Sequence, residues 1–239
     1  MLPTERPSIT LPAILGGWME ERIAVAGHAF DVLRPSQPDE FLERLEDLDR
    51  AEAEQDPYWA ELWPTSSRMA AFVLGETWQR GTRALELGCG VGLVGLAGLK
   101  AGLDITFSDL HDLAVRTAVE NAERNGFSSV PGRVLDWRQP DSGNWPLIFA
   151  SDVLYERQLH QPLLSTLDAC LSADGVCWLG DPVRSAADSF VEAATTRGYS
   201  VKILDANGRQ TSDEDDRFRL LRLIRDVLPA KQDSNLAIE

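Results

Sequence analysis

The chain has 239 residues, of which 44% are hydrophobic and 26% are charged, and its formal net charge is −15 at pH 7. This composition is typical of a globular domain with a sizeable core, and no apolar run approaches the roughly 20 residues of a membrane-spanning helix. The acidic charge argues against a nucleic-acid-binding surface, which needs clustered Lys and Arg, and favours a basic or lysine-bearing partner. The N-terminus lacks the basic start and apolar core of a secretory signal, so we expect a cytoplasmic monomer with no membrane partner.

The three cysteines of the chain are Cys89, Cys170 and Cys177. Their number is odd, and no CxxC or Cys/His spacing occurs among them, so neither a disulfide framework nor a zinc site is indicated. We expect buried thiols and no bound metal.

The N-terminal part of the chain predicts an extension that precedes the main sheet. Residues 22–35, RIAVAGHAFDVLRP, are typical of a β-hairpin that turns around Gly27. Residues 39–55 have the pattern of a polar helix, and residues 66–79 that of an amphipathic helix that leads into the sheet.

From residue 83 onward, short β-rich segments alternate with segments of helical apolar spacing. The expected strands are 83–88, 104–109, 132–137, 146–155, 175–181, 200–205 and 218–225. The expected helices are 92–102, 110–126, 160–175 and 186–199. This alternation predicts a largely parallel sheet with crossover helices.

The last two expected strands have only a short acidic loop between them, with no room for a packed helix, so they should pair antiparallel. The predicted fold is therefore α/β: a Rossmann-like sheet of seven mostly parallel strands with an antiparallel last strand, helices on both faces and an N-terminal extension. We place the extension at 1–57, the main domain at 58–228 and a flexible tail at 229–239.

The first strand of this sheet runs into a glycine-rich segment, ALELGCGVGLVG at 84–95. Read from Gly90 it matches the dinucleotide fingerprint GxGxxG, and read from Glu86 it suggests a different cofactor. Glycines let the backbone approach a ligand and present N–H groups at a helix start. Asp109 ends the next strand and can accept two hydrogen bonds from a ribose diol, which both kinds of cofactor offer. At this point both interpretations remain open.

Two further strand ends carry candidate site residues. Asp136 and Trp137 can supply a hydrogen-bond acceptor and an aromatic wall for an adenine ring, although a core role for Trp137 is equally compatible with the sequence. Asp152 directly follows the buried run PLIFAS, where a carboxylate is costly unless it binds something, and a helix N-cap is the competing interpretation. None of the three histidines falls at a strand end.

In this order, the segments resemble the seven-stranded S-adenosylmethionine-dependent methyltransferases, and more narrowly the protein-lysine methyltransferases of family 16. The resemblance covers roughly positions 58–225. The motifs that carry it are ELWP at 61–64, LELGCGVGLVGL at 85–96, SDL at 108–110, NAERN at 121–125, LDW at 135–137 and SDVLY at 151–155. The last contains the Asp-x-x-Tyr pattern typical of that group.

The segments DVLYERQL and GVCWLGDPVR also resemble the branch that methylates the β-subunit of electron-transfer flavoprotein. That branch tends to carry DPGR, where this chain has DPVR, and a glycine pair after WP, where this chain has Thr65 and Ser66. The resemblance therefore implies a protein-lysine substrate more strongly than it implies this particular one.

The resemblance implies a role for each candidate residue. Gly88, Gly90 and Gly92 would line the methionine part of S-adenosylmethionine, with Glu86 bracing the loop, and Asp109 with Leu110 would hold the ribose. Asp136 and Trp137 would contact the adenine, Trp63 would cover the cofactor, and Ala150 and Ser151 would form the floor of the site. Asp152 and Tyr155 would face the acceptor as catalytic residues.

The leading hypothesis is thus methyl transfer to a lysine of a protein, with positioning carrying most of the catalysis. We assign Asp152 to capture and orientation of the acceptor, because a nearby carboxylate favours the charged ammonium over the reactive amine. A small-molecule N-methyltransferase is the alternative, since the core fold fixes the cofactor better than the acceptor. An NAD(P)-dependent oxidoreductase and a non-catalytic cofactor-binding module are more remote.

Overall fold

The computed structural model of the chain describes residues 11–14, 16–37, 57–205 and 218–226. The strands are β1 Trp18–Val25, β2 His28–Pro35, β3 Arg83–Leu87, β4 Asp104–Asp109, β5 Gly132–Val134, β6 Trp145–Ser151, β7 Leu171–Asp181, β8 Tyr199–Leu204 and β9 Arg219–Arg225. The helices are α2 Pro64–Gly75, α3 Leu93–Lys100, α4 Asp112–Arg124, α5 His160–Cys170 and α6 Ser185–Thr196, with short 3₁₀ turns η1 Pro57–Ala60 and η2 Arg157–Leu159. The expected polar helix at 39–55, the acidic loop and the tail at 229–239 lie outside the described residues.

The main sheet has seven strands in the order β5-β4-β3-β6-β7-β9-β8. Neighbouring strands from β5 to β7 pair in parallel, and β9 pairs antiparallel with both β7 and β8. This topology confirms the predicted fold class, including the antiparallel last strand. It brings the carboxyl ends of β3, β4 and β6 to one edge of the sheet, where open α/β sheets bind their ligands.

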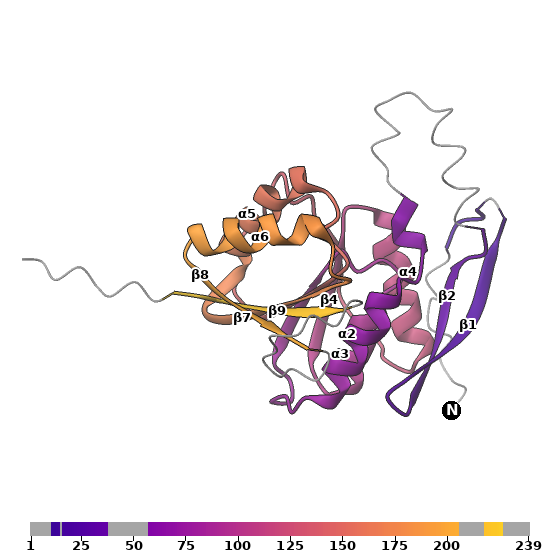
Figure 1. Cartoon of the computed structure of the whole chain (residues 1–239). Helices are drawn as coiled ribbons and strands as arrows, with labels where there is room; N and C mark the ends of the chain where they lie inside the picture. Colours follow the sequence, from indigo (N-terminus) through magenta and orange to yellow (C-terminus); the bar gives the residue numbers. More distant parts are fainter. Residues whose placement is uncertain (1–10, 15, 38–56, 206–217, 227–239) are drawn as a thin grey trace, which may run out of the picture.

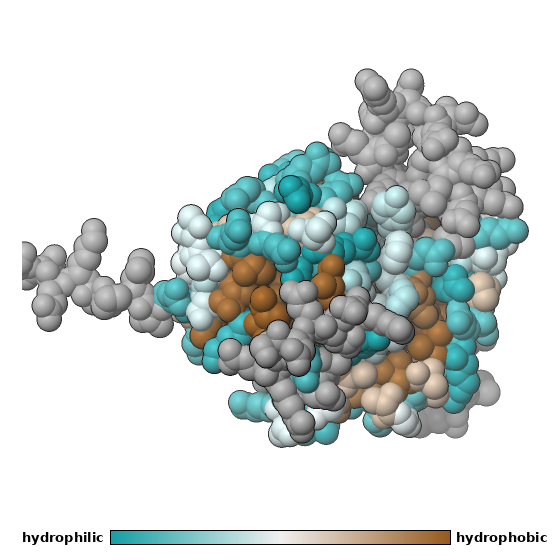
Figure 2. Space-filling view, in the orientation of Figure 1, coloured by the Kyte–Doolittle hydropathy of each residue, from teal (hydrophilic) through white to brown (hydrophobic). Residues whose placement is uncertain are grey.

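Helices cover both faces of the sheet (Figure 1). Met69 of α2, Leu96 of α3 and Ala118 of α4 belong to one buried core. Leu163 of α5 and Phe190 of α6 belong to a second core on the opposite face. Strands buried on both sides are expected to be almost continuously apolar, and the buried part of β3, ALEL, is apolar apart from Glu86. The outer surfaces of α5, α6 and the hairpin are largely hydrophilic (Figure 2).

The predicted N-terminal hairpin is present as β1 and β2, and it packs against α4 through two asparagines (Figure 1). The buried Asn121 amide accepts a hydrogen bond from the Leu33 backbone N–H at 2.7 Å and donates to the Leu33 carbonyl at 3.0 Å. One helical turn later, Asn125 makes the same pair of contacts with the backbone of Asp31. The NAERN motif therefore supplies the helix side chains that satisfy the free edge of β2.

Several expected elements have different boundaries in the structure. The strand expected at 146–155 ends at Ser151, and the helix expected at 66–79 spans Pro64–Gly75. The helix expected at 160–175 ends at Cys170, and β7 begins at the next residue. Gly175 lies within β7, where a Cβ would come within 2.9 Å of the Trp145 carbonyl, beside a register shift between β6 and β7. This glycine marks an irregularity in a strand rather than a helix end. The strand expected at 132–137 ends at Val134, so Asp136 and Trp137 lie in the following loop.

The three cysteines are buried and free, as predicted. The described part of the chain contains no group of His, Cys, Asp and Glu side chains arranged to hold a metal ion. None of the helices in the described ranges combines the length and hydropathy that a membrane crossing needs.

Candidate active site

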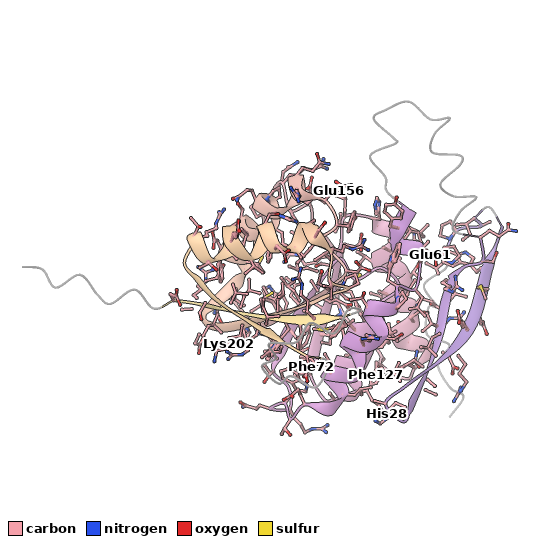
Figure 3. All side chains as sticks on the ribbon, viewed as in Figure 1. His28, Glu61, Phe72, Phe127, Glu156 and Lys202 are labelled. Carbon is pink, nitrogen blue, oxygen red and sulfur yellow. The ribbon has the colours of Figure 1, made fainter. Side chains whose placement is uncertain are left out.

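A cavity of about 580 Å³ opens at the carboxyl ends of β3, β4 and β6, next to η1 and the start of α2. All of the predicted site residues line it except Gly92 and Ala150. The residues come from segments that are distant in sequence, so the sheet topology alone brings them together. The lining also includes Glu61 and Glu156, which both lie in the upper part of Figure 3, far from the hairpin tip at His28.

The glycine-rich loop after β3 forms one wall of the cavity with bare backbone. Gly88 and Gly90 both have positive φ, +63° and +50°. A Cβ on Gly88 would lie 3.1 Å from the Val153 side chain, and one on Gly90 would lie 3.0 Å from the Trp59 carbonyl. Side chains at these two positions would therefore be strained and would crowd the space that a ligand needs.

Gly92 has a different task. It has φ +87° and is the N-cap residue of α3, and a Cβ there would come within 2.8 Å of the Ala118 Cβ on α4. Its small size thus permits close packing of α3 against α4, and it does not contribute to the cavity lining. The spacing of the three glycines gave no indication of this division of roles.

Asp109 joins the ends of β3 and β4. One carboxylate oxygen accepts a hydrogen bond from the Gly90 N–H and the other from the His111 N–H, each at 3.0 Å. Burial raises the pKa of Asp109, and these hydrogen bonds act in the opposite direction. The side chain shapes both loops and still lines the cavity, where it can also accept hydrogen bonds from a ligand diol. His111, which the sequence left without a site role, lines the cavity beside it.

Glu86 is buried within the same wall. Its side chain accepts a hydrogen bond from the Gly95 N–H in the first turn of α3 at 2.8 Å. Burial is the main cause that raises the pKa of Glu86 to about 8, and the nearby Asp109 adds to the rise. This hydrogen bond agrees with the expectation that Glu86 braces the glycine loop. Burial also favours the neutral form of the Glu86 carboxyl group until a cationic ligand binds nearby.

The loop after β5 carries Asp136 and Trp137, the two residues that the sequence assigned to an adenine. The Trp137 ring lies 3.6 Å from the Cβ position of Gly88, so the ring packs beside the glycine loop. Asp136 is held by Arg138, whose Nε lies 3.0 Å from Oδ1; these contacts lower the pKa of Asp136 although partial burial opposes them. Leu110 is 40% exposed at the rim of the cavity.

Aromatic side chains enclose the opposite side of the cavity. Trp63 donates a hydrogen bond from its indole N–H to the Tyr58 carbonyl at 3.0 Å. The Tyr58 ring meets both the Trp63 ring and the Tyr155 ring edge-on, with centroids 5.9 Å apart in each case. Sequence reasoning missed Tyr58, which lies just before the ELWP motif and joins the predicted cover residue to the predicted acceptor residue.

Asp152 lies where β6 leaves the sheet, with its side chain only 4% exposed. Its Oδ1 atom accepts hydrogen bonds from Arg184, with Nε at 2.8 Å and Nη2 at 2.7 Å. Thr65 donates to its other oxygen at 3.4 Å. Arg184 belongs to the DPVR segment that the sequence comparison singled out, but nothing local indicated that it would pair with Asp152. No N-cap contact of Asp152 to a helix occurs among the described residues.

The neighbouring Ser151 presents an unsatisfied group. Its Oγ atom is buried, and no hydrogen-bond partner for it occurs among the described residues. Because the residue lines the cavity, a ligand atom is the natural partner for this hydroxyl. Ala150 lies behind it, fully buried in the β6 core, and supports the floor without lining it.

These features fit an adenosine-type cofactor. The bare glycine wall, the Asp109 carboxylate and the Trp137 ring suit a methionine chain, a ribose and an adenine respectively, and the Ser151 hydroxyl lacks a protein partner. The hydride-transfer residues that an NAD(P)-dependent enzyme needs do not occur in the cavity lining, where His111 is the only histidine and no lysine is present among the described residues.

The chain is similar to several known proteins. A family model described as lysine methyltransferase matches residues 46–196. The electron transfer flavoprotein beta subunit lysine methyltransferase of Danio rerio is 29% identical over 133 residues, which are 54% of this chain and 52% of that protein. EEF1A lysine methyltransferase 3 of Mus musculus is 28% identical over 165 residues, which are 64% of this chain and 66% of that protein. The chain thus spans about half the length of the first of these relatives.

Among solved structures, a TehB-like SAM-dependent methyltransferase from Corynebacterium glutamicum superposes with a TM-score of 0.54 at 18% identity. The match covers 81% of this chain and 100% of that one. At this identity the likeness concerns the fold, and it supports the topology described above.

Proposed function

The chain belongs to the lysine methyltransferase family, and from this premise we propose that it transfers a methyl group from S-adenosylmethionine to a lysine side chain of another protein. The observation that carries the proposal is that one cavity joins the glycine wall and Asp109 to the acceptor-side pair Asp152 and Tyr155. A module that only bound the cofactor would have no use for the second half of this cavity.

Each half of the cavity has a proposed task. Gly88, Gly90 and Asp109 hold the methionine and ribose parts of the cofactor, and Asp136 with Trp137 holds the adenine. Trp63 covers the cofactor and excludes water. When bound, the cofactor supplies an electrophilic methyl group, so the protein needs to position rather than to form a covalent intermediate.

The acceptor must arrive as a neutral amine. A lysine with a pKa near ~10.4 loses its proton at a cost of about 4 to 5 kcal/mol near pH 7. Asp152 is already occupied by Arg184 and Thr65, so we assign it to orientation of the amine and assign proton loss to water. The amine lone pair then forms the nitrogen–carbon bond as the carbon–sulfur bond breaks, and that electron pair stays on sulfur. Tyr155 forms a wall of the acceptor channel.

The names of the relatives suggest which protein to test first. The Danio rerio relative is named for the electron transfer flavoprotein beta subunit and the Mus musculus relative for EEF1A, both of them proteins. We propose a protein substrate for this chain as well, with the flavoprotein subunit as the first candidate. We further propose a monomer that acts in the cytoplasm without nucleic acid or membrane partners, and a domain that spans 58–228.

Two measurements test the function. Calorimetry should give binding of S-adenosylmethionine and S-adenosylhomocysteine and at least 100-fold weaker binding of NAD; tighter binding of NAD would refute the cofactor assignment. Incubation with methyl-labelled cofactor and a proteome extract, followed by mass spectrometry, should then locate methyl groups on lysine side chains. Label found only in small molecules would replace the protein substrate by the small-molecule alternative.

A further inference from the structure

The acceptor side of the cavity is built from two loops with unusual backbone. Asp152 follows β6 with φ +58°, and Val183 precedes Arg184 with φ +62°. Non-glycine residues rarely adopt this left-handed conformation, and a β-branched residue such as valine is a clear outlier there. The Asp152 N–H donates to the Gly180 carbonyl at 2.9 Å, which ties the two loops together. Strained residues of this kind cluster where side chains must be aimed at a functional site.

The two loops together place the Asp152–Arg184 ion pair at the cavity. The guanidinium of Arg184 contacts a single carboxylate oxygen of Asp152 through two nitrogens, at 2.8 and 2.7 Å. The Asp152 side chain is 4% exposed, whereas the Arg184 side chain is 36% exposed. The carboxylate is therefore the desolvated partner, and its charge is compensated by an arginine that remains partly in water.

The position of Arg184 is fixed from its own loop as well. Its backbone N–H donates to both oxygens of Asp181, at 3.1 and 3.0 Å, and its carbonyl accepts from Arg219 at 2.9 Å. Arg219 in turn contacts Asp188 at 2.8 Å. The Arg184 guanidinium also lies over the Tyr155 ring, 6.0 Å from its centroid. Arg184 thus contacts both residues that we assign to the acceptor.

Most of the ionisable side chains that line the cavity are carboxyl groups. The carboxyl groups in it are Glu61, Glu86, Asp109, Asp136, Asp152 and Glu156. Of these, Asp136 has Arg138 as its partner and Asp152 has Arg184. An uncompensated carboxylate at the acceptor would stabilise an ammonium against the amine, and it would stabilise a sulfonium against the thioether that forms from it. Both effects oppose methyl transfer.

We propose that Arg184 is a positioning residue of the acceptor site. It fixes the Asp152 carboxylate as an oriented hydrogen-bond acceptor and cancels the charge that would hold the acceptor as an unreactive ammonium. The proposal rests on the proposed function, because it assigns a charge balance to the same cavity. It gives a role to the strained loop after β7.

The test compares two ligands that differ by one positive charge. S-adenosylmethionine carries a sulfonium and S-adenosylhomocysteine a neutral thioether, so the ratio of their dissociation constants reports the charge at the transfer point without any acceptor. In Arg184→Gln the uncompensated Asp152 should shift this ratio in favour of S-adenosylmethionine by about tenfold. Arg184→Lys retains the charge and should stay within about threefold of the native ratio. Isothermal calorimetry gives both constants.

Two further variants separate charge from folding. The double variant Asp152→Asn/Arg184→Gln should return to within about threefold of the native ratio, because neither charge remains. Asp152→Asn alone should shift the ratio the opposite way, and this result decides the matter if Arg184→Gln does not fold. Arg197→Gln removes a surface arginine that pairs with Asp168 on α5 and should leave the ratio unchanged.

The outcomes distinguish the inference from the function. An unchanged ratio in folded Arg184→Gln, or a tenfold shift that persists in the double variant, would overturn the role of Arg184 while leaving the cofactor assignment intact. Failure of the native chain to bind either ligand would instead refute the proposed function itself. With a labelled protein acceptor in hand, Arg184→Gln should lower kcat without raising KM, since the ammonium form would still bind.

Discussion

The half of the cavity that we assign to the cofactor has a wall of bare backbone, whereas the half that we assign to the acceptor is enclosed by side chains. Between β3 and β5, left-handed glycines and short loops form a wall of bare backbone, and Asp109 accepts hydrogen bonds from the N–H groups of Gly90, 19 positions earlier, and His111. At β6 and β7, valine and aspartate occupy the left-handed conformation, and an ion pair joins residues 32 positions apart. The glycines of the proposed cofactor half are therefore visible in one continuous motif, whereas the ion pair of the acceptor half appears only when the sheet brings two loops together.

This difference predicts how each half responds to substitution. Changes in the cofactor half should alter affinity for the cofactor, because the loop that holds it loses its shape. Changes in the acceptor half should alter turnover or charge preference while cofactor binding stays close to native.

The largest expected effect concerns Asp109. Asp109→Ala leaves the N–H groups of Gly90 and His111 without their acceptor and removes the proposed ribose contact. We expect a loss of about 2 to 4 kcal/mol of affinity for S-adenosylhomocysteine, measured by calorimetry. Asp112→Ala, at an exposed position in the first turn of α4, is the control and should bind as the native chain does. Native affinity in Asp109→Ala would show that the carboxylate does not contact the ligand.

The next effect concerns turnover. Asp152→Asn keeps the shape of the side chain but removes the charge that Arg184 fixes, so the amine loses its oriented acceptor. Methyl transfer to the acceptor identified by labelling should fall by about 100-fold, or about 2.7 kcal/mol, while affinity for S-adenosylhomocysteine stays within about threefold. Asp188→Asn removes the exposed partner of Arg219 and serves as the control. Native turnover in Asp152→Asn would exclude an acceptor role.

A third effect appears in stability against pH. The pKa of Glu86 is about 8 in the folded chain against an ordinary 4.5, so between these pH values the folded form keeps a proton that the unfolded chain has lost. The contribution of Glu86 to the free energy of unfolding without ligand should therefore be fully present below pH 4.5 and be lost as pH rises to 8.

Glu86→Gln removes this titration and keeps an oxygen for the Gly95 N–H. Urea unfolding should show the variant more stable than the native chain at pH 8, with the two nearly equal near pH 4. An identical pH slope in both proteins would mean that Glu86 does not bind this proton.

The smallest expected effect concerns the strained loop. Val183→Gly relieves a left-handed conformation that costs an L-residue roughly 1 to 2 kcal/mol. The greater loss of backbone entropy by glycine on folding offsets about 0.5 to 1 kcal/mol of this gain. The variant should gain about 0.5 to 1 kcal/mol in unfolding free energy by urea titration. Val183→Ala retains the Cβ and should gain little, so equal stabilisation by both would show that φ is not the cause.

The sequence predicted the fold well because its strands and helices differ in apolar period and are separated by glycines. Gly88 and Gly90 were also predictable as cavity residues, since a bare loop after a strand has few other uses. Gly92 was not, because the same spacing serves a ligand wall and close packing on Ala118 equally. Their proposed contacts with the cofactor remain predictions.

The partner of Asp152 could not be predicted for a physical reason. Arg184 lies beyond a helix and a strand, and its guanidinium reaches Asp152 only because β6 and β7 pair in parallel and end together. Tyr58 was missed because a single tyrosine in a short turn carries no periodic pattern. Contacts that depend on strand order, rather than on local spacing, cannot be predicted until the strand order is known.

The asparagine pair on α4 has a practical consequence for the boundary of the domain. A shortened version of this protein that began at residue 58 would retain Asn121 but lose both Leu33 contacts, and its buried amide would keep only the Val91 carbonyl at 2.9 Å. Because Val91 belongs to the glycine loop, the same asparagine connects the hairpin to the ligand wall. The hairpin therefore supports the domain proposed at 58–228, and shortened versions intended for binding or crystallisation work should start before residue 18.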